Sequence, residues 1–554
     1  MRTAPPATHG KGLLVAAWSL ALLPLLFFAV QVPRFGALQY NDYYGILQEL
    51  ADGDGLSTDP FRWLAVRSNE HTVTLPALVY AANIAATHGD NRGLSAFSLL
   101  VLAATLLLLS RLLPDGIRRG AALAVALPLL ALLVFTPAAA HSIVMGFSGT
   151  IWFTANLAAV AAIAALTRLE RDAPVTALWP VLTAGLVAAL SNSTSLALWP
   201  ALVVGALVRR LPRRHLAVLG AATAVAFAAF LARFHALPWH PKPNTDHPLS
   251  LASYVAAYLG SLLTSRAGAA VVIGALALAA SVALVAMARR DLASRAPWLM
   301  LQLYGLGAGL GTAVGRSGWG DAQALASRYA SLAALFWIGL LGSLLVTALS
   351  ASPPARRRAG VLACAGLAAV AGVGAFVRGL PVLASLVERA RGHRVASLAL
   401  VHGITDPEAF RSFHPFVGDR GDVTAEWAYA YLQRRRHVPF QRRWWTELGA
   451  PPPPGTVLAG EPFAGESALG AVRPLGGGRA RVSGRIEPAS GRLGHVLLLD
   501  PNGIVRGEGV PVPRGDGAWQ GYVDDVPPGA ALAVFVRLAG GEAYHRLPDA
   551  LALP

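Results

Sequence analysis

The chain has 554 residues, of which 55% are hydrophobic and 14% are charged, and its mean hydropathy is +0.51. A soluble domain carries roughly 25% charged residues, so this composition excludes a purely soluble enzyme. Basic residues outnumber acidic ones by 46 to 30, but the arginines occur in short runs between apolar stretches. That pattern is typical of membrane topology rather than of a nucleic-acid-binding face.

The first predicted element is an apolar run over 12–32, which follows Arg2 and Lys11 and is longer than the core of a usual signal peptide. We expect an uncleaved first transmembrane helix with a cytoplasmic amino terminus. A spanning helix needs about 20 mostly apolar residues, and ten further runs fit this pattern: 94–113, 120–140, 149–167, 176–191, 196–208, 216–233, 266–287, 297–314, 329–350 and 358–377. The sequence therefore predicts an α-helical polytopic membrane protein with about 11–13 transmembrane helices.

Arginine-rich connectors recur at every second gap between these runs, and the positive-inside rule places them on the cytoplasmic side. Counting Thr72–His88 as a full crossing would move every arginine cluster to the wrong face, so we expect a partial or re-entrant segment there. A compensating crossing at Leu251–Leu263 is the alternative, although that run is short for a span.

With this topology, 1–377 forms the transmembrane domain and everything after about Arg378 lies outside the cytoplasm. The segment 378–455 is charged and helix-like and ends in a proline-rich linker. From 456 to 554, apolar and polar residues alternate between turns, as in 480–486, 495–500, 519–523 and 531–538. This pattern predicts an extracytoplasmic β-sandwich.

The outer loop at 33–71 is too long for a simple connector, and loops of this length usually carry function or are disordered. Asp42 lies just after the first span, beside Tyr43 and Tyr44, and Glu70 and His71 lie at the far end of the loop. Both ends return to the membrane-water interface, so these carboxylates and this imidazole are candidate catalytic groups. The plainer interpretations are that Asp42 caps a helix and that Glu70 and His71 form a solvated pair.

A second cluster precedes the run at 329–350. Arg316 and Arg328 flank a glycine-rich turn that also holds Asp321, and guanidinium groups bind phosphate oxygens in a bidentate manner. The alternative is that Arg328 and Tyr329 anchor the next helix at the headgroup level. Weaker outer candidates are His141, His240 and Lys242.

The single cysteine, Cys364, excludes a disulfide framework and a cysteine-based metal site. The predicted spans carry no acidic residues, which weakens the interpretation as an ion-coupled transporter. The residues identify no certain cofactor, and binding of a divalent metal remains an open alternative. They give no reason to expect nucleic acid as a partner.

This layout resembles the GT-C superfamily of polytopic glycosyltransferases, which use lipid-phosphate-linked sugars on the outer or lumenal face. The resemblance rests on an inside start, on Asp42 close after the first span, on many further spans and on an outer domain at 378–554. The family's loop motif commonly has two adjacent acids, whereas this chain has Asn41 and Asp42. Glu70, from the far end of the loop, is the candidate for the second acid.

The resemblance implies transfer of a sugar from a polyprenyl-phosphate carrier to an extracytoplasmic glycan, lipid or protein acceptor at a bacterial inner membrane. Asp42 would be the general base, assisted by Glu70 and His71. Arg316 and Arg328, with Tyr329, would hold the donor phosphate. The resemblance also implies glycan binding by the β-sandwich and further substrate contacts from Tyr43, Tyr44, His141, His240, Lys242 and Asp321.

Two alternatives remain open at this point. An O-antigen-type ligase or polymerase would act through His141, Arg316 and Arg328, with Asp42 as a helix cap. From a different class, the chain could be a lipid or glycan transporter or a non-catalytic envelope assembly factor, although the spans offer few polar residues for a transport path.

Overall fold

The structure is a computed structural model that describes residues 9–40, 42–53, 55–234, 242, 247–289, 291–411, 413, 425–441, 445–512 and 517–553. The chain divides into two compact units. The helical unit comprises Met1–Val32, Ser57–Tyr80 and Leu94–Leu386, and the second unit comprises Pro33–Leu56, Ala81–Gly93 and Val387–Pro554.

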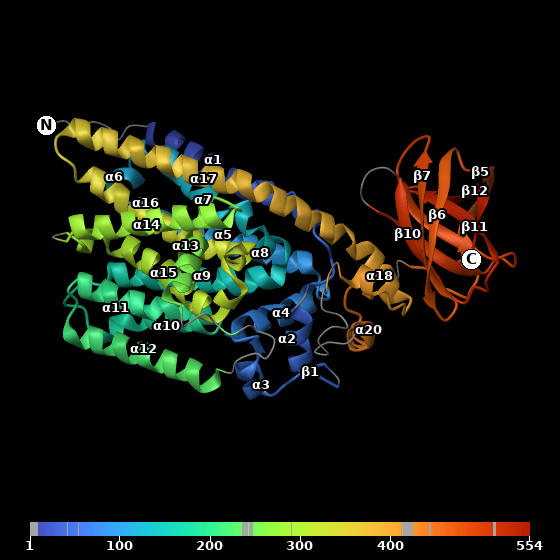
Figure 1. Cartoon of the computed structure of the whole chain (residues 1–554), viewed down its shortest axis with the longest axis horizontal. Coiled ribbons are helices and arrows are strands. Elements are labelled where there is room, and N and C mark those ends of the chain that lie inside the picture. The colour runs from blue at the N-terminus through green and yellow to red at the C-terminus, as the bar shows by residue number, and fades with distance from the viewer. Residues whose placement is uncertain are drawn as a thin grey trace. The chain divides into compact units, whose positions relative to one another are not determined.

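Helices make up nearly all of the helical unit (Figure 1). Helices α4, α5 and α17 continue into the second unit. The helices are α1 (His9–Ala29), α3 (Pro60–Ala65), α4 (Thr74–Thr87), α5 (Asn91–Leu112), α6 (Asp115–Arg118), α7 (Leu123–Val134), α8 (Ala140–Val144), α9 (Gly146–Arg168), α10 (Trp179–Ala189), α11 (Leu198–Val208), α12 (Arg213–Arg233), α13 (Pro248–Gly260), α14 (Ala267–Met287), α15 (Ala296–Arg316), α16 (Ala330–Leu349) and α17 (Pro354–Arg391).

All eleven expected spans are helical, and within the described residues eight helical segments are long and apolar enough to cross a membrane. These eight are Gly12–Arg34, Asn91–Leu112, Leu123–Val144, Gly146–Arg168, Arg213–Arg233, Ala267–Met287, Ser327–Leu349 and Pro354–Val401. The runs at 176–191 and 196–208 form shorter apolar helices, and 297–314 forms α15, which is long but holds Gln302 and five glycines. Helix α4 has 14 residues, fewer than a span of about 20 requires. The polytopic helical class is confirmed.

Small residues and one buried amide hold neighbouring helices together in this unit. A Cβ atom on Gly274 of α14 would lie 1.8 Å from the Ala256 carbonyl oxygen of α13, so the two helices approach closely because this position has no side chain. Between α15 and α16, Gln302 donates to the Gly339 carbonyl oxygen (3.1 Å) and to Ser343 Oγ (2.9 Å). Close backbone approach therefore fixes α14 on α13, and satisfied polar groups fix the first half of α15 on α16.

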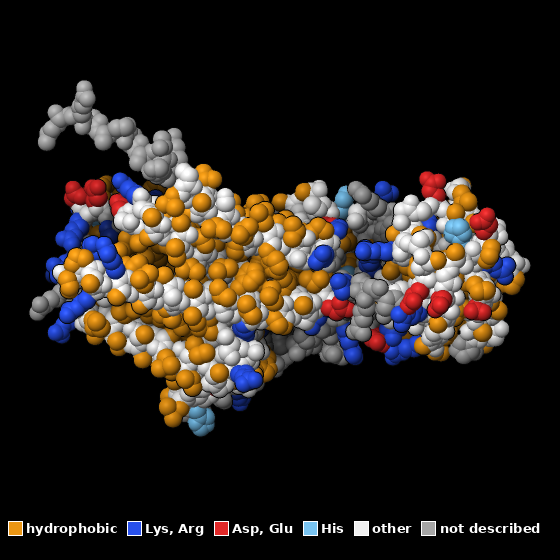
Figure 2. Space-filling model, turned by 90° about the horizontal axis from the view of Figure 1, so that it is seen from above, with side chains coloured by type: hydrophobic (Ala, Val, Ile, Leu, Met, Phe, Trp, Pro, Cys, Tyr) orange, Lys and Arg blue, Asp and Glu red, His pale blue; other side chains and the backbone are white. Residues whose placement is uncertain are grey.

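The arginine-rich connectors gather at one end of the helical unit, and hydrophobic side chains cover the face beyond them (Figure 2). Arg171 donates to the Arg209 carbonyl oxygen at 3.2 Å, and Arg214 donates to the Ala173 carbonyl oxygen at 3.0 Å. Two connectors that are distant in sequence therefore lie side by side. We call this the basic end of the unit.

The second unit contains α2 (Asp42–Leu50), the short strands β1 (Ala51–Asp52) and β2 (Gly55–Leu56), and helices α18 (His393–Val401), α19 (Pro407–Phe410) and α20 (Ala425–Arg434). Its largest element is an eight-stranded sheet in the order β5-β12-β11-β8-β9-β10-β7-β6 (Figure 1). The strands are β5 (Val457–Pro462), β6 (Gly465–Gly476), β7 (Arg479–Pro488), β8 (Leu493–Leu499), β9 (Val505–Pro511), β10 (Ala518–Val523), β11 (Ala531–Leu538) and β12 (Ala543–Ala552).

All neighbouring strands in this sheet are antiparallel except β12 and β5. The sheet curls until β12 contacts β6, and it encloses a core that includes Val482, Val496, Trp519 and Val534. An all-β carboxyl-terminal domain was expected, but the backbone pairing runs through all eight strands rather than dividing into the two sheets of a sandwich. Bulges between Ala533 and Phe535 and in neighbouring strands allow this curvature.

Candidate functional site

An ion pair between Arg316 and Glu70 lies at the centre of the candidate site. Arg316 is the last residue of α15, at the opposite end of that helix from Arg295, and it is 8% exposed. Its Nη2 atom donates to Glu70 Oε1 at 2.5 Å. A guanidinium group has five N–H donors, so it can bind a carboxylate and a phosphate at the same time.

A two-residue hairpin places Glu70 and His71. Strands β3 (Arg67–Ser68) and β4 (His71–Thr72) pair antiparallel, and Asn69 in the turn has a positive φ of 54°, as hairpin turns of this length require. Ser193 fixes the turn from outside, because its hydroxyl donates to the Glu70 carbonyl oxygen (3.1 Å) and accepts from the Thr72 amide (3.2 Å). The carboxylate is therefore held in place before any substrate binds.

Aromatic rings extend from His71 towards α13. The His71 ring lies 5.9 Å from Trp152 of α9, Trp152 lies 5.8 Å from Tyr329, and Tyr329 lies 5.4 Å from Tyr258. His71 Nε2 also lies 3.7 Å from Glu70 Oε1. Trp152, Tyr329 and Tyr258 are buried, so the charged groups lie against low-dielectric walls, where electrostatic interactions are stronger than in water.

Arg328 lies in the short 3-10 turn Ser327–Tyr329 that begins the next long helix. Its guanidinium lies 4.8 Å from the centre of the Tyr329 ring, and its Nη2 donates to the Tyr329 hydroxyl at 3.2 Å. Ser327 ties this turn to the segment of His141: its hydroxyl accepts from the His141 amide (3.1 Å) and donates to the Ala138 carbonyl oxygen (2.6 Å). Arg328 and His141 therefore come from adjacent segments.

Helix α13 contributes residues that the sequence did not single out. Ser253 donates to Asp321 Oδ2 at 2.5 Å, and Tyr254 and Tyr258 are fully buried. Burial and Tyr329 raise the pKa of Tyr254, whereas the positive charges of Arg328 and Arg316 act in the opposite direction. Tyr254 is therefore a neutral hydroxyl within the electrostatic influence of both guanidinium groups.

The helical unit thus brings together Glu70, His71, Arg316, Arg328 and Tyr329, with Asp321 and His141 on adjoining segments. The residues that sequence reasoning missed are Trp152, Ser253, Tyr254 and Tyr258. Trp152 lay inside a predicted span, and the three residues of α13 lay in a run judged too short to cross. The sequence feature that could have identified these residues is the presence of an aromatic or polar side chain within an otherwise apolar run.

Asp42, Tyr43 and Tyr44 belong to the second unit, at the start of α2. Asp42 is exposed in the first turn, whereas Tyr43 and Tyr44 are 2% and 1% exposed and pack in the core of this unit. In this arrangement the two tyrosines support α2. Asn41 and His240 lie outside the described residues, and Lys242 is exposed.

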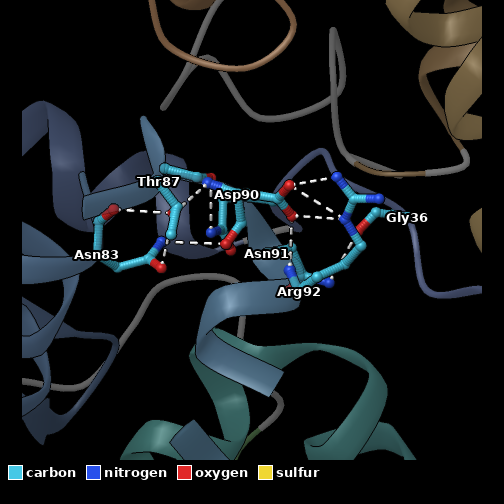
Figure 3. A network of polar contacts seen from close by, with 8 residues as sticks. Gly36, Asn83, Thr87, Asp90, Asn91 and Arg92 are labelled. Carbon is cyan, nitrogen blue, oxygen red and sulfur yellow. Dashed lines mark hydrogen bonds and ion pairs between the residues drawn. The ribbon is translucent and has the colours of Figure 1, made fainter. Parts of the chain in front are cut away.

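A polar network fixes the segment that leads into α2 (Figure 3). Asn91 donates to the Gly36 carbonyl oxygen at 3.0 Å. Gln39 donates to the Gly89 carbonyl oxygen at 2.9 Å. Asp90 accepts from the Arg92 side chain, with Nε at 3.0 Å from both carboxylate oxygens. The turn between α4 and α5 thereby holds the chain immediately before Asp42.

No group of three histidine, cysteine, aspartate or glutamate side chains that could hold a metal ion is found among the residues that the structure describes. The site instead offers guanidinium groups, a carboxylate, an imidazole and buried tyrosines. Such a set can bind an oxyanion and can stabilise negative charge that develops on it.

Together, the described helices and strands define a multi-pass membrane protein with an all-β carboxyl-terminal domain. Two crystal structures of ArnT from Cupriavidus metallidurans are similar to this chain. The apo structure has a TM-score of 0.42 and 17% identity, over 78% of this chain and 90% of that one. The structure bound to undecaprenyl phosphate has a TM-score of 0.40 and 16% identity, over 77% and 90%. No protein-family model and no curated protein matches the chain.

Proposed function

We propose that this chain is a membrane glycosyltransferase that moves a sugar from a polyprenyl-phosphate-linked donor to a glycan, lipid or protein acceptor. The observation that carries the proposal is the buried Arg316, held by Glu70 beside Arg328 and a row of aromatic rings. A substrate that is dissolved in water would not need buried arginines and aromatic rings inside a membrane-embedded unit. A lipid-linked phosphate does need them, because its chain stays in the bilayer while its anionic group needs fixed cations.

In the proposed reaction, the acceptor hydroxyl attacks the anomeric carbon of the donor sugar, and the bond from that carbon to the phosphate oxygen breaks. The electron pair leaves with the phosphate, where Arg316 and Arg328 stabilise the added negative charge. The acceptor proton passes to a carboxylate. Asp42, exposed at the start of α2, is the proposed general base.

Glu70 and His71 then have a positioning role. Glu70 orients the Arg316 guanidinium, and His71 lies between Glu70 and Trp152. The proposal places the reaction on the outer face of a bacterial inner membrane, with the amino terminus in the cytoplasm. The β-domain is proposed to bind or position glycan outside the membrane.

A second candidate function is an O-antigen-type ligase or polymerase that uses arginine and histidine. The hydrogen bond between the His141 amide and Ser327, next to Arg328, favours it. In that reaction His141 would take the acceptor proton and Asp42 would have no catalytic role.

The test is sugar transfer by the purified chain in proteoliposomes. Radiolabelled undecaprenyl-phosphate hexoses and pentoses are supplied with membrane extract as the acceptor, and loss of label from the donor is measured. Asp42→Asn should abolish transfer and His141→Ala should preserve it; the reverse result would establish the second candidate. An intact donor across the whole panel would reject the enzymatic function.

A further inference from the structure

A cavity of about 390 Å³ lies in the helical unit between α7, α16 and α17, with the start of α15 at one side. Its lining is apolar apart from the thiol of Cys364 and the indole of Trp298. Small residues from different segments line it, including Ala122, Ala126 and Ala365, and they leave the space open. Water or a polar solute would find almost no hydrogen-bonding partners in it.

The cavity is separate from the candidate transfer site. Trp298 lines it and lies in the first turn of α15, whereas Arg316 is the last residue of the same helix. At about 1.5 Å per residue, the two positions are about 27 Å apart along the helix axis. The cavity is therefore near the basic end of the unit.

Arginines border the cavity at that end. Arg357 and Arg358 are exposed and lie four residues before the lining residues Val361 and Leu362, so they share that face of α17. Arg118 follows the lining residue Ile117.

Acidic charge near the same border is small. Asp115 forms ion pairs with Arg118 and Arg119, the latter at 3.6 Å. Arg356, Arg357 and Arg358 have no acidic residue among their sequence neighbours. Positive charge therefore predominates at this border of the cavity.

We propose that the cavity holds an acyl chain of an anionic phospholipid from the leaflet at the basic end, with its phosphate between Arg357, Arg358 and the pair Arg118 and Arg119. The apolar lining accepts the chain, and the arginines select the charge of the headgroup. Basic pockets between membrane helices bind anionic headgroups in this way. The site stabilises the packing of α17 on α7 and α16.

The test is native mass spectrometry of the purified full chain with added phosphatidylglycerol, phosphatidylcholine of the same acyl chains, or undecaprenyl phosphate. Wild type should retain one phosphatidylglycerol in preference to phosphatidylcholine. Ala365→Phe fills the cavity and should remove this copy. Ala363→Phe, on the exposed face of the same helix, should not.

A charge variant tests the headgroup contact without changing the core. Arg357→Gln with Arg358→Gln should weaken phosphatidylglycerol binding about tenfold or more, because each arginine near an anionic surface contributes to binding. Arg213→Gln with Arg289→Gln removes two exposed arginines that do not border the cavity and should leave binding unchanged.

Three results would overturn the proposal. Equal retention of phosphatidylglycerol and phosphatidylcholine would show that the arginines do not select the headgroup. Retention of phosphatidylglycerol by Ala365→Phe would show that the lipid binds outside the cavity. Displacement of the retained copy by undecaprenyl phosphate at lower concentration would identify a polyprenyl chain as the occupant.

Discussion

The Arg316 guanidinium forms a 2.5 Å ion pair with the Glu70 carboxylate, although 246 residues separate them in the chain. Both side chains are largely buried, at 10% and 18% exposed. Taking such charges out of water is costly unless each has its partner. Glu70 therefore keeps the positively charged Arg316 guanidinium at a defined place in the helical unit.

Arg316 and Glu70 should be strongly coupled in stability. Arg316→Gln and Glu70→Gln each leave a buried charge without its partner, and each should destabilise the fold by about 3–5 kcal/mol. The double variant should melt at a higher temperature than either single variant. Thermal unfolding in detergent measures this, and simple additivity of the two effects would contradict it.

The pair Arg295 and Asp291 is the matched comparison for that experiment. Arg295 is buried at the other end of α15, but Asp291 is 59% exposed and their contact is 3.1 Å. An exposed partner is stabilised by water, so the coupling in this pair should be below about 1 kcal/mol.

Replacement of Arg316 by lysine should impair transfer although it keeps the positive charge. Lysine is a point charge and cannot reproduce the planar fork that binds two phosphate oxygens. We expect kcat to fall about tenfold or more for Arg316→Lys and about 100- to 1000-fold for Arg316→Gln. Arg295→Lys is the control, and equal losses in both lysine variants would indicate a general effect on folding.

The variant Tyr329→Phe separates the contribution of the ring contacts of Tyr329 from that of its hydroxyl group. Phenylalanine keeps the ring contacts with Trp152 and Tyr258 but removes the hydroxyl to which Arg328 donates at 3.2 Å. Stability should change by about 1 kcal/mol, whereas KM for the donor should rise because Arg328 loses its fixed orientation. An unchanged KM with reduced stability would show that Tyr329 acts in packing alone.

The β-domain should lose stability in acid through Glu508, which is fully buried. His402 Nε2 lies 2.8 Å and His495 Nε2 2.5 Å from its carboxylate, and the Thr446 amide donates to it at 3.0 Å. Burial raises the pKa of Glu508, but the hydrogen bonds and charges of His402 and His495 outweigh burial and hold it below the usual value.

A lowered pKa means that the ionised form stabilises the fold. This contribution is complete above the unfolded pKa of about 4.3 and is lost as the pH falls through the folded pKa. The protection factors of the β8 and β9 amides in the full chain, which are exchange rates corrected for the intrinsic rate at each pH, should therefore fall on acidification. Glu508→Gln should exchange faster already at pH 7, whereas Glu461→Gln, exposed on β5, should behave as wild type.

Asn91→Ala should loosen the segment that precedes α2. The substitution removes the donor to the buried Gly36 carbonyl oxygen and should cost about 1–3 kcal/mol. Hydrogen exchange over 36–50 should increase. Asn83→Ala is the comparison: it removes a contact within the α4–α5 turn, to the Asp90 carbonyl oxygen, and should affect 36–50 less.

Local patterns predicted most of the fold. Apolar runs of span length correspond to the long helices, because a run of about 20 apolar residues has to be helical to satisfy its backbone in a bilayer. Alternation over 531–538 corresponds to β11 for a similar local reason. The continuous curl of the sheet was not predictable, because the alternation of apolar and polar residues within one strand does not indicate which other strand it pairs with.

The sequence by itself determined the membrane class, the connectors that carry arginine, and the residue types suited to bind phosphate, since composition and periodicity are local properties. The tertiary structure decided that Glu70, from a hairpin, meets Arg316, from the end of α15, and that Tyr258 and Trp152 enclose Tyr329. These contacts depend on how helices pack against one another. Ion pairs and ring contacts between distant segments produce no periodic pattern in the sequence from which they could be predicted.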